Sequence, residues 1–420
     1  MVRTFKYDVV VVGGGTAGVA AAVGSSKAGA KVLLIERNPY LGGEATHSGV
    51  NAFCGFFSCG ENPVKVVEGV GNQVLEEMEK LGPTTIEYII SAAGNKNINF
   101  QTEYLKCAMD NLLEKENVNY LLHARVISSE IESNKIRSIQ CVDDEGFFKV
   151  EANVFVDASG DANLAFLSGA KTMWGDSKNQ VQAATLPFRL SGVDISKDMS
   201  PTAVENAIRK AKKDGITYLT KEKGFIIKMT GSDSVTVLLP SAMISSISSE
   251  NLTEVEKDTR RQVLSYVEAF KRYMPGMEKC QLIMIGPSIG FRETRRLHGK
   301  EIIQIEDVLE RRKRADGIAR GGWKPEIHKS LNEMGTYLEV ENGSYFDIPL
   351  GALQSINIEN LYGAGRIISS DEVAFAAVRV MGTCFATGHA AGVAAAYQAL
   401  NGNVNIEKIR KELENQKALI

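Results

Sequence analysis

The stretch VVVVGGGTAGVAAAVGSSKAGAKVLLIERN, residues 9–38, decides the fold. Four consecutive valines are typical of a strand that is buried on both faces of a parallel sheet. Gly13, Gly15 and Gly18 follow with the spacing G-x-G-x-x-G. In this pattern the first glycine permits a tight turn, the second lets a pyrophosphate approach bare backbone, and the third allows the next helix to pack closely against the strand.

A helix and a second strand complete this unit. Residues 16–28 are rich in alanine and contain no proline, which predicts a helix whose N-terminal amides point at the phosphates. The strand KVLLIE then ends at Glu36, roughly 20 residues after the first glycine, where an acid accepts hydrogen bonds from an adenosine ribose. The segment therefore predicts a dinucleotide site. The acid favours FAD or NAD over NADP, although the adjacent Arg37 weakens that preference.

The loop after the second strand carries a further glycine pair. In RNPYLGGEATHSG, Gly42 and Gly43 again offer bare backbone beside a phosphate. Here the sequence resembles the FAD-containing oxidoreductases of the glutathione reductase and fumarate reductase superfamily. Segments at 154–170, 290–296, 347–353 and 360–396 resemble a bacterial group within it that is described as FAD-dependent oxidoreductases; they read VFVDASGDANLAFLSGA, GFRETRR, DIPLGAL and NLYGAGRIISSDEVAFAAVRVMGTCFATGHAAGVAAA. The resemblance implies an extended FAD.

This resemblance, together with the sequence pattern, predicts an α/β fold. A Rossmann-like FAD-binding domain of the glutathione reductase type, residues 1–170 and 345–420, is expected to be interrupted by a mixed α+β substrate domain, residues 171–344. Hydrophobic periodicity predicts helices and strands in both parts. The expected helices cover residues 66–82, 101–117, 201–215 and 248–274, and the expected strands cover residues 188–195 and 280–286 together with several between 118 and 156.

The candidate FAD contacts come from the first motif and from the resemblance. By analogy, Asp371 would bond the ribityl or pyrophosphate region, and a helix beginning near Gly382 and Thr383 would direct partial positive charge at the flavin pyrimidine. His47 is either a loop residue in contact with the isoalloxazine or a site of covalent attachment to it. The full set is Gly13, Gly15, Thr16, Ala17, Gly18, Glu36, Arg37, Gly42, Gly43, Ala45, Thr46, His47, Arg125, Val126, Ala158, Ser159, Gly160, Asp161, Gly365, Arg366, Asp371, Met381, Gly382 and Thr383.

The candidate catalytic residues crowd into GFRETRRLHG, and they are Arg292, Glu293, Arg295 and His298. Guanidinium groups suit carboxylates or sugar hydroxyls, and a glutamate or histidine can act as a base. A solvated helix start with internal ion pairs would give the same composition. Other candidates are Arg189 as an anion contact, and Trp323 and His328 in a glycine-rich loop that we expect to form a lid over substrate.

Cysteines give an alternative chemistry. Cys54 and Cys59 have the C-x-x-x-x-C spacing of flavin disulfide reductases, but they stand farther from the glycine pair than in those enzymes. We therefore favour loop residues that cover the flavin over a redox dithiol. The other cysteines and the five histidines are dispersed, so no metal site is expected.

Composition indicates a cytoplasmic enzyme. The 420-residue chain has a net charge of −3, which gives no reason to expect nucleic acid, and no apolar run is long enough for a bilayer. The first strand begins too early for a signal peptide. We therefore predict an FAD-dependent oxidoreductase that transfers a hydride between a small polar organic substrate and flavin N5, with an unidentified electron partner. The alternatives are a thiol-disulfide reductase using Cys54 and Cys59, or a non-redox FAD-containing isomerase or binding protein. A homodimer is compatible with the sequence.

Overall fold

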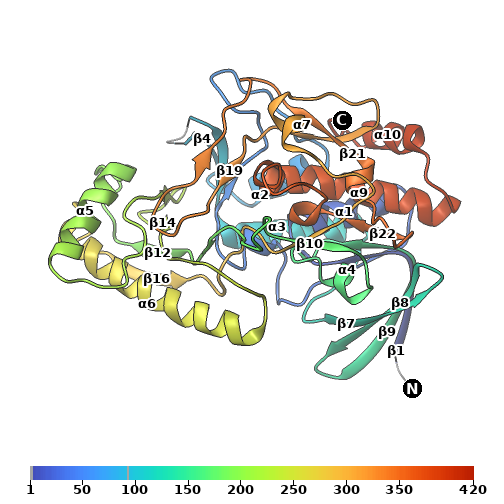
Figure 1. Cartoon of the computed structure of the whole chain (residues 1–420), viewed down its shortest axis with the longest axis horizontal. Helices are drawn as coiled ribbons and strands as arrows, with labels where there is room; N and C mark the ends of the chain where they lie inside the picture. The colour runs from blue at the N-terminus through green and yellow to red at the C-terminus, as the bar shows by residue number, and fades with distance from the viewer. Residues whose placement is uncertain (1–2, 92–93) are drawn as a thin grey trace.

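The valine strand lies at the centre of a mixed sheet. The computed structural model describes residues 3–91 and 94–420, and its largest sheet has the strand order β6-β2-β1-β9-β8-β7, with β22 beside β9. Figure 1 labels β1, β7, β8, β9 and β22 of this sheet. Strands β6, β2, β1, β9 and β22 run parallel, whereas the β7–β8–β9 meander is antiparallel. The bounds are β1 (Arg3–Val12), β2 (Val32–Ile35), β6 (Asn119–Leu121), β7 (Arg125–Glu132), β8 (Lys135–Asp143), β9 (Gly146–Asp157) and β22 (Leu361–Gly363).

Two buried helices from opposite ends of the sequence pack against each other beside this sheet. Helices α1 (Thr16–Lys27) and α9 (Met381–Asn401) lie side by side in the centre of the molecule (Figure 1). A Cβ atom at Gly388 would lie 2.2 Å from the carbonyl oxygen of Ala17, and one at Gly392 would lie 2.1 Å from that of Ala21. The backbones therefore approach too closely for any larger residue. Small residues on all sides let α1 and the first sixteen positions of α9 be largely buried.

Amphipathic helices and a small antiparallel sheet complete this layer. The predicted helices at 66–82 and 101–117 are confirmed as α2 (Val70–Leu81) and α3 (Thr102–Lys115). The small sheet has the order β3-β5-β4. Its bounds are β3 (Ala52–Phe53), β4 (Ile86–Ile90) and β5 (Lys96–Phe100), and shorter helices are α4 (Asn163–Leu167), α7 (Ile305–Leu309), α8 (Phe375–Val378) and α10 (Ile406–Asn415).

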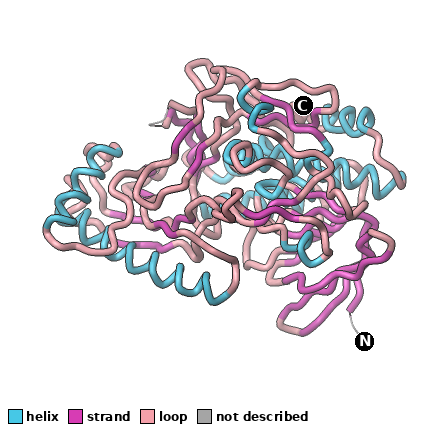
Figure 2. The backbone as a smooth tube through the Cα atoms, viewed as in Figure 1, coloured by secondary structure: helices cyan, strands magenta, loops and turns pink. Residues whose placement is uncertain are grey.

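A second hydrophobic core lies at the other end of the molecule. It includes buried residues from Val181 to Ile289, where a sheet of order β13-β14-β12-β16 packs with helices α5 and α6 (Figures 1 and 2). The predicted helices and strands are present, but β12 ends at Ser191, before the predicted end, because Gly192 turns the chain at φ +66°. The bounds are β12 (Phe188–Ser191), β13 (Ile226–Lys228), β14 (Val235–Val237), β16 (Gln281–Ile285), α5 (Pro201–Lys213) and α6 (Ser249–Tyr273).

The segment after Ile289 returns to the first part of the molecule. Leu297, Ile303 and Val308 are buried in the two cores that surround the large sheet. The second core therefore ends well before residue 344, where the sequence suggested the end of the substrate domain. The remaining strands form short pairs: β10 (Thr172–Trp174) with β17 (Arg295–Leu297), β11 (Ala184–Thr185) with β15 (Ser241–Ala242), β18 (Gly317–Gly321) with β21 (Phe346–Pro349), and β19 (Glu326–Ile327) with β20 (Thr336–Tyr337).

The architecture is a mixed α/β fold built on a parallel sheet. Among the described residues, we find no helix with the length and apolar character needed to cross a membrane.

Candidate functional site

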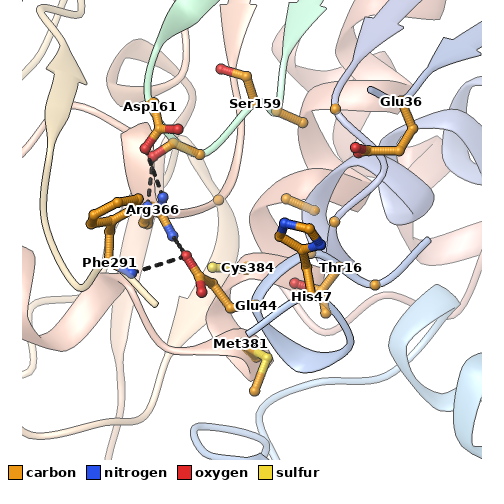
Figure 3. A pocket seen from close by; sticks show the side chains of 18 of the residues that line it. Thr16, Glu36, Glu44, His47, Ser159, Asp161, Phe291, Arg366, Met381 and Cys384 are labelled. Atoms are coloured by element: carbon orange, nitrogen blue, oxygen red, sulfur yellow. Dashed lines mark hydrogen bonds and ion pairs between the residues drawn. The ribbon is translucent and has the colours of Figure 1, made fainter. Parts of the chain in front are cut away.

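A cavity lies where four parallel strands end. It is open to solvent, and it is lined by residues of the first motif and of the loops after the neighbouring strands. Strands β1, β2, β9 and β22 are parallel, so the loops that follow them meet at one sheet edge, and each of those loops supplies lining residues (Figure 3). Crevices at the carboxyl ends of parallel strands are where α/β folds bind ligands.

The glycines of the first motif have distinct structural roles. Gly13 turns at φ +103°, and a Cβ atom there would lie 2.5 Å from the carbonyl oxygen of Ala158. A Cβ atom at Gly18 would lie 1.7 Å from the carbonyl oxygen of Gly13, so this glycine is required for α1 to pack on the turn. Gly15 differs from both: its φ is −70°, and an added Cβ would meet only the Cα of Gly43, at 3.7 Å. It lines the cavity and leaves the space above it open.

Glu36 is held rigidly at the end of β2. Its carboxylate accepts hydrogen bonds from the backbone N–H of Gly14 at 2.6 Å and of Asn38 at 2.8 Å. The side chain is 6 % exposed and lines the cavity. Because a carboxylate has about four acceptor positions, these two bonds leave capacity for ligand hydroxyl groups.

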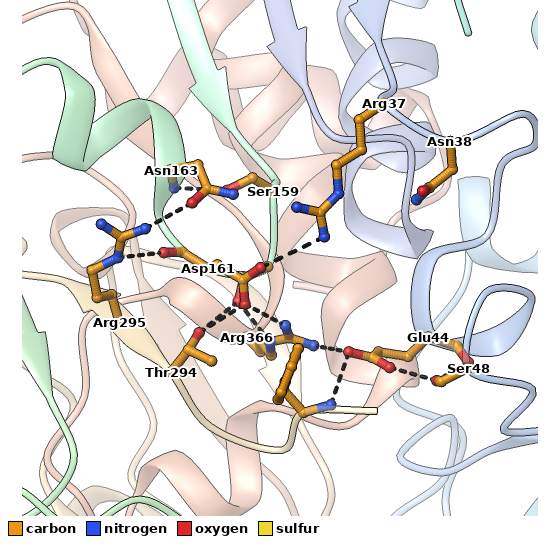
Figure 4. Close-up of polar contacts among 12 residues, drawn as sticks. Arg37, Asn38, Glu44, Ser48, Ser159, Asp161, Asn163, Thr294, Arg295 and Arg366 are labelled. Carbon is orange, nitrogen blue, oxygen red and sulfur yellow. Dashed lines mark hydrogen bonds and ion pairs between the residues drawn. The ribbon is translucent and has the colours of Figure 1, made fainter. Parts of the chain in front are cut away.

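A buried ionic bridge connects three cavity-lining segments. Arg366 donates to Glu44 at 2.5 Å, to Asp161 at 2.8 Å and to the carbonyl oxygen of Gly160 at 2.6 Å (Figure 4). Burial alone would lower the pKa of Arg366, but the two carboxylates raise it above the ordinary value. Glu44 also accepts from the backbone N–H of Phe291 at 3.3 Å. The bridge therefore fixes the loops after β2, β9 and β22 relative to one another.

Two helix N-termini meet the cavity without side-chain caps. Gly15 caps α1 and Val380 caps α9, and neither supplies a side-chain hydrogen bond. Thr16 and Met381, the first residues of the two helices, both line the cavity. The hydroxyl of Thr383 is buried and has no partner among the described residues. Uncapped N-termini favour groups with negative charge or acceptor oxygens, such as a pyrophosphate and the carbonyl groups of a flavin pyrimidine.

Most of the predicted cofactor residues line this cavity, and eight do not. Sixteen are brought together: Gly13, Gly15, Thr16, Ala17, Glu36, Arg37, Gly42, Gly43, His47, Ala158, Ser159, Gly160, Asp161, Gly365, Arg366 and Met381. Those outside the lining are Gly18, Ala45, Thr46, Arg125, Val126, Asp371, Gly382 and Thr383. The carboxylate of Asp371 instead accepts from the backbone N–H groups of Ile305, Val373 and Ala374 at 2.6–2.8 Å, so it fixes the local chain.

Sequence reasoning missed eight lining residues: Asn38, Glu44, Ser288, Ile289, Phe291, Ala364, Arg379 and Cys384. Asn38 and Glu44 lie inside loops already singled out, and an acidic residue between Gly43 and Ala45 was the signal available for Glu44. No pattern around Arg379 indicated that it would reach the cavity.

His47 lines the cavity, and its buried Nδ1 has no partner among the described residues. Burial lowers the pKa of this imidazole, and the positive charge of Arg37 adds to that effect against the nearby acids. The neutral ring is therefore favoured.

The four predicted catalytic residues lie outside the cavity lining. Glu293 forms a buried ion pair with Arg296 and accepts from the backbone N–H of Gln182 at 3.0 Å. Arg295 donates to the carbonyl oxygen of Asp161 at 2.9 Å and to Asn163 at 2.7 Å. The Nδ1 atom of His298 contacts the carbonyl oxygen of Gly299 at 3.2 Å. These three side chains contact other groups of the chain. This agrees with the alternative given above, in which the charges of this segment form internal pairs.

Arg292 is the fourth of these residues and has a different environment. It donates to the carbonyl oxygen of Ala183 and the hydroxyl of Thr185, both at 2.7 Å. Burial lowers the pKa of its guanidinium to about 10, and the positive charge of Arg379 contributes. Arg292 therefore lies close to a second arginine that does line the cavity.

The fold and the cavity together define an α/β protein with a dinucleotide cradle at the carboxyl edge of its parallel sheet. The model of the FAD dependent oxidoreductase family matches residues 8–417, and the chain belongs to this family. It is an FAD-dependent oxidoreductase, and its cofactor is FAD.

Short matches to curated proteins concern only part of the chain. A soluble pyridine nucleotide transhydrogenase from Ectopseudomonas mendocina is 49 % identical over 45 residues, which are 11 % of this chain and 10 % of that protein. A fumarate reductase (cytochrome) from Shewanella frigidimarina is 53 % identical over 47 residues, 11 % of this chain and 8 % of that protein. The chain therefore matches about a tenth of the length of these relatives.

A solved structure shares the fold along the whole chain. The geranylgeranyl bacteriochlorophyll reductase-like protein from Thermoplasma acidophilum has a TM-score of 0.50 and 15 % identity, with 99 % of this chain and 84 % of that chain covered. At this identity the similarity concerns the fold alone.

Proposed function

We propose that the protein transfers a hydride between a small polar organic substrate and flavin N5, with the FAD bound in the cavity described above. The observation that carries this proposal is the meeting of four parallel strand ends and two uncapped helix N-termini at one cavity. The amides of α1 would hold the pyrophosphate, Glu36 the ribose, and the amides of α9 the pyrimidine edge. FAD supplies the acceptor for two electrons, and the chain supplies binding, orientation and exclusion of water.

The domain arrangement is part of the same proposal. Residues 1–170 and 345–420 would form an FAD-binding domain of the glutathione reductase type. Residues 171–344 would form the substrate domain, which contains the second core but sends the stretch 297–319 back to pack on the FAD-binding part. We propose a separate electron partner for the second half-reaction and a cytoplasmic location without nucleic-acid or membrane partners. We also propose a homodimer.

Two alternatives compete with hydride transfer. A thiol-disulfide reductase would need a reactive thiolate, but burial raises the pKa of Cys54 to about 12 and also raises that of Cys59. Thiols in this state are poor nucleophiles at neutral pH, which argues against that chemistry. An experiment distinguishes a non-redox role of FAD from hydride transfer, because only net oxidation of a substrate leaves the flavin reduced.

Visible spectroscopy tests the function directly. We expect a yellow protein that releases FAD into the supernatant on acid denaturation, and that bleaches under anaerobic conditions when a small polar substrate is added. Turnover without bleaching would contradict net hydride transfer and favour an isomerase. Colour retained in the pellet would indicate a covalent bond and make His47 the first residue to replace.

Gly15→Ala tests the assignment of the pyrophosphate position. The apoprotein is expected to fold with unchanged stability, since φ is −70° and the nearest backbone atom to the new Cβ is 3.7 Å away. FAD affinity is expected to fall at least tenfold, about 1.4 kcal/mol, because the methyl group occupies the phosphate approach. Titration of apoprotein with FAD measures the change. Unaltered affinity would place the pyrophosphate elsewhere.

A matched substitution controls for the added methyl group. Gly82→Ala places a Cβ 3.6 Å from a Thr85 methyl group, outside the cavity lining. This variant is expected to keep both its stability and its FAD affinity.

A further inference from the structure

A second polar cluster is buried beside the cofactor cavity. We call it the Arg379 cluster, and its members are Lys221, Arg292, Glu326, His328, Tyr337 and Arg379. Glu326 of β19 and Tyr337 of β20 are direct cross-strand partners, which places their side chains together. Arg379 lines the cavity, so the cluster adjoins the flavin position that the proposed function requires.

The single carboxylate of the cluster is already fully engaged. Glu326 contacts the Nε2 atom of His328 at 3.1 Å, accepts from the hydroxyl of Tyr337 at 2.9 Å, and lies 3.8 Å from Arg379. Burial, then Arg292 and the other neighbouring charges, hold the pKa of His328 down at about 3, so the imidazole is neutral. Among the cluster members, the two arginines exceed the single negative charge of Glu326 by one; Glu44, outside the cluster, also acts on Arg292.

Lys221 adds a cation with no partner. The residue is 3 % exposed, and its ammonium has no hydrogen bond or ion pair within the part of the chain that the structure describes. Its backbone is fixed, because the hydroxyl of Tyr266 bonds both its N–H, at 2.7 Å, and its carbonyl oxygen, at 2.8 Å. Desolvation and the positive charge of Arg292 together lower the pKa of Lys221 to about 7, against the opposing effect of Glu326.

Further polar atoms of the cluster lack partners. Nδ1 of His328 and Nε of Arg379 are buried and unpaired within the described residues. Buried polar atoms are almost always satisfied in native proteins, and a bound ligand is one reason for the exceptions. Both atoms belong to the cluster whose arginines outnumber its carboxylate. A small anion with acceptor oxygens would satisfy them.

We propose that Arg292, Arg379 and Lys221 bind the carboxylate of the substrate, so that the enzyme acts on small carboxylic acids. This inference rests on the proposed function for its position next to the flavin. A singly charged, planar carboxylate matches both the guanidinium forks and the single excess charge of the arginines. Arg292 and Arg379 position the substrate, and Lys221 supplies an amine that exchanges a proton with it or strengthens its binding.

The test uses acetate as the probe and acetamide as its neutral counterpart, on the FAD-loaded protein at constant ionic strength. Calorimetry and the flavin difference spectrum report binding. We expect acetate to bind and to perturb the flavin absorbance, and acetamide to do neither. Arg292→Gln and Lys221→Met are each expected to weaken acetate binding at least tenfold.

Lys223→Met is the matched control. Lys223 lies two residues away and forms only a partly exposed ion pair with Glu205 at 3.7 Å, so its loss should leave acetate binding unchanged. Equal binding of acetate and acetamide, or acetate binding that survives both cluster substitutions, would overturn the inference. Preference for inorganic phosphate over acetate would overturn the carboxylate assignment. If Arg292→Gln fails to fold, Lys221→Met, which keeps an unbranched side chain one atom shorter than that of lysine, gives the same readout.

The outcomes also separate this inference from the proposed function. If a substrate reduces the flavin but the protein does not bind acetate, the carboxylate site is refuted and hydride transfer is not. If acetate binds in a way that depends on Lys221 but no substrate reduces the flavin, hydride transfer is refuted and the carboxylate site is not.

Discussion

Gly18→Ala is expected to abolish the folded FAD cradle. The new Cβ atom would lie 1.7 Å from the carbonyl oxygen of Gly13, a backbone atom that cannot move without opening the turn after β1. Overpacking in a core costs about 1–3 kcal/mol when side chains adjust, and this clash with backbone should exceed that range. We expect low soluble yield, a large fall in melting temperature, and no bound FAD.

The contrast with Gly15→Ala makes this prediction specific. Both substitutions add one methyl group to the same motif, but only the one at residue 18 meets a backbone atom at close range. Melting curves of the two apoproteins measure the difference. A Gly18→Ala protein as stable as the natural chain would show that α1 does not pack on the turn as described.

Lys221→Met is expected to stabilise the protein while it weakens anion binding. The folded-state pKa of Lys221 is lowered to about 7, whereas the unfolded chain binds the proton up to its ordinary value of 10.5. Between these two pH values the unfolded state binds more protons, so the contribution of Lys221 to stability rises with pH through this window. Below pH 7 the full cost of burying the charge is present, and above pH 10.5 it has vanished.

Methionine removes that cost and its pH dependence. One pKa unit corresponds to about 1.4 kcal/mol, so the gain at pH 6 is expected to be on the order of a few kcal/mol, and it should shrink toward pH 9. Melting temperatures of the natural chain, Lys221→Met and Lys223→Met across this range isolate the effect, since all other titrating groups are shared. A destabilised Lys221→Met protein with a pH-independent difference would mean that the ammonium is paired in the folded state.

The cofactor cradle could be predicted because its signals are local. Gly13, Gly15 and Glu36 stand at a spacing that follows from a single strand-turn-helix-strand unit, whose geometry depends little on the rest of the chain. Helices α2, α3, α5 and α6 were predictable for the same reason: each shows its buried face in its own periodicity.

The Arg379 cluster could not be predicted because its members come together only in the folded chain. Lys221 stands in a loop before β13, Glu326 in a two-residue strand, and Arg379 between two helices. Nothing in their sequence neighbourhoods distinguishes them from surface charges. Conversely, the crowding of Glu293 and Arg295 suggested catalysis, but the structure pairs these charges with partners on the chain.

The contact between α1 and α9 constrains when the protein can fold during synthesis. Gly388 and Gly392 seat on Ala17 and Ala21, so the first helix lacks its main packing surface until the ribosome has made the last part of the chain. At about 5–20 residues per second, that delay is on the order of 20 s or more. Until then the nascent β1–α1–β2 unit exposes valines and alanines that are buried in the folded chain. The FAD site can be completed only after α9 has been synthesised.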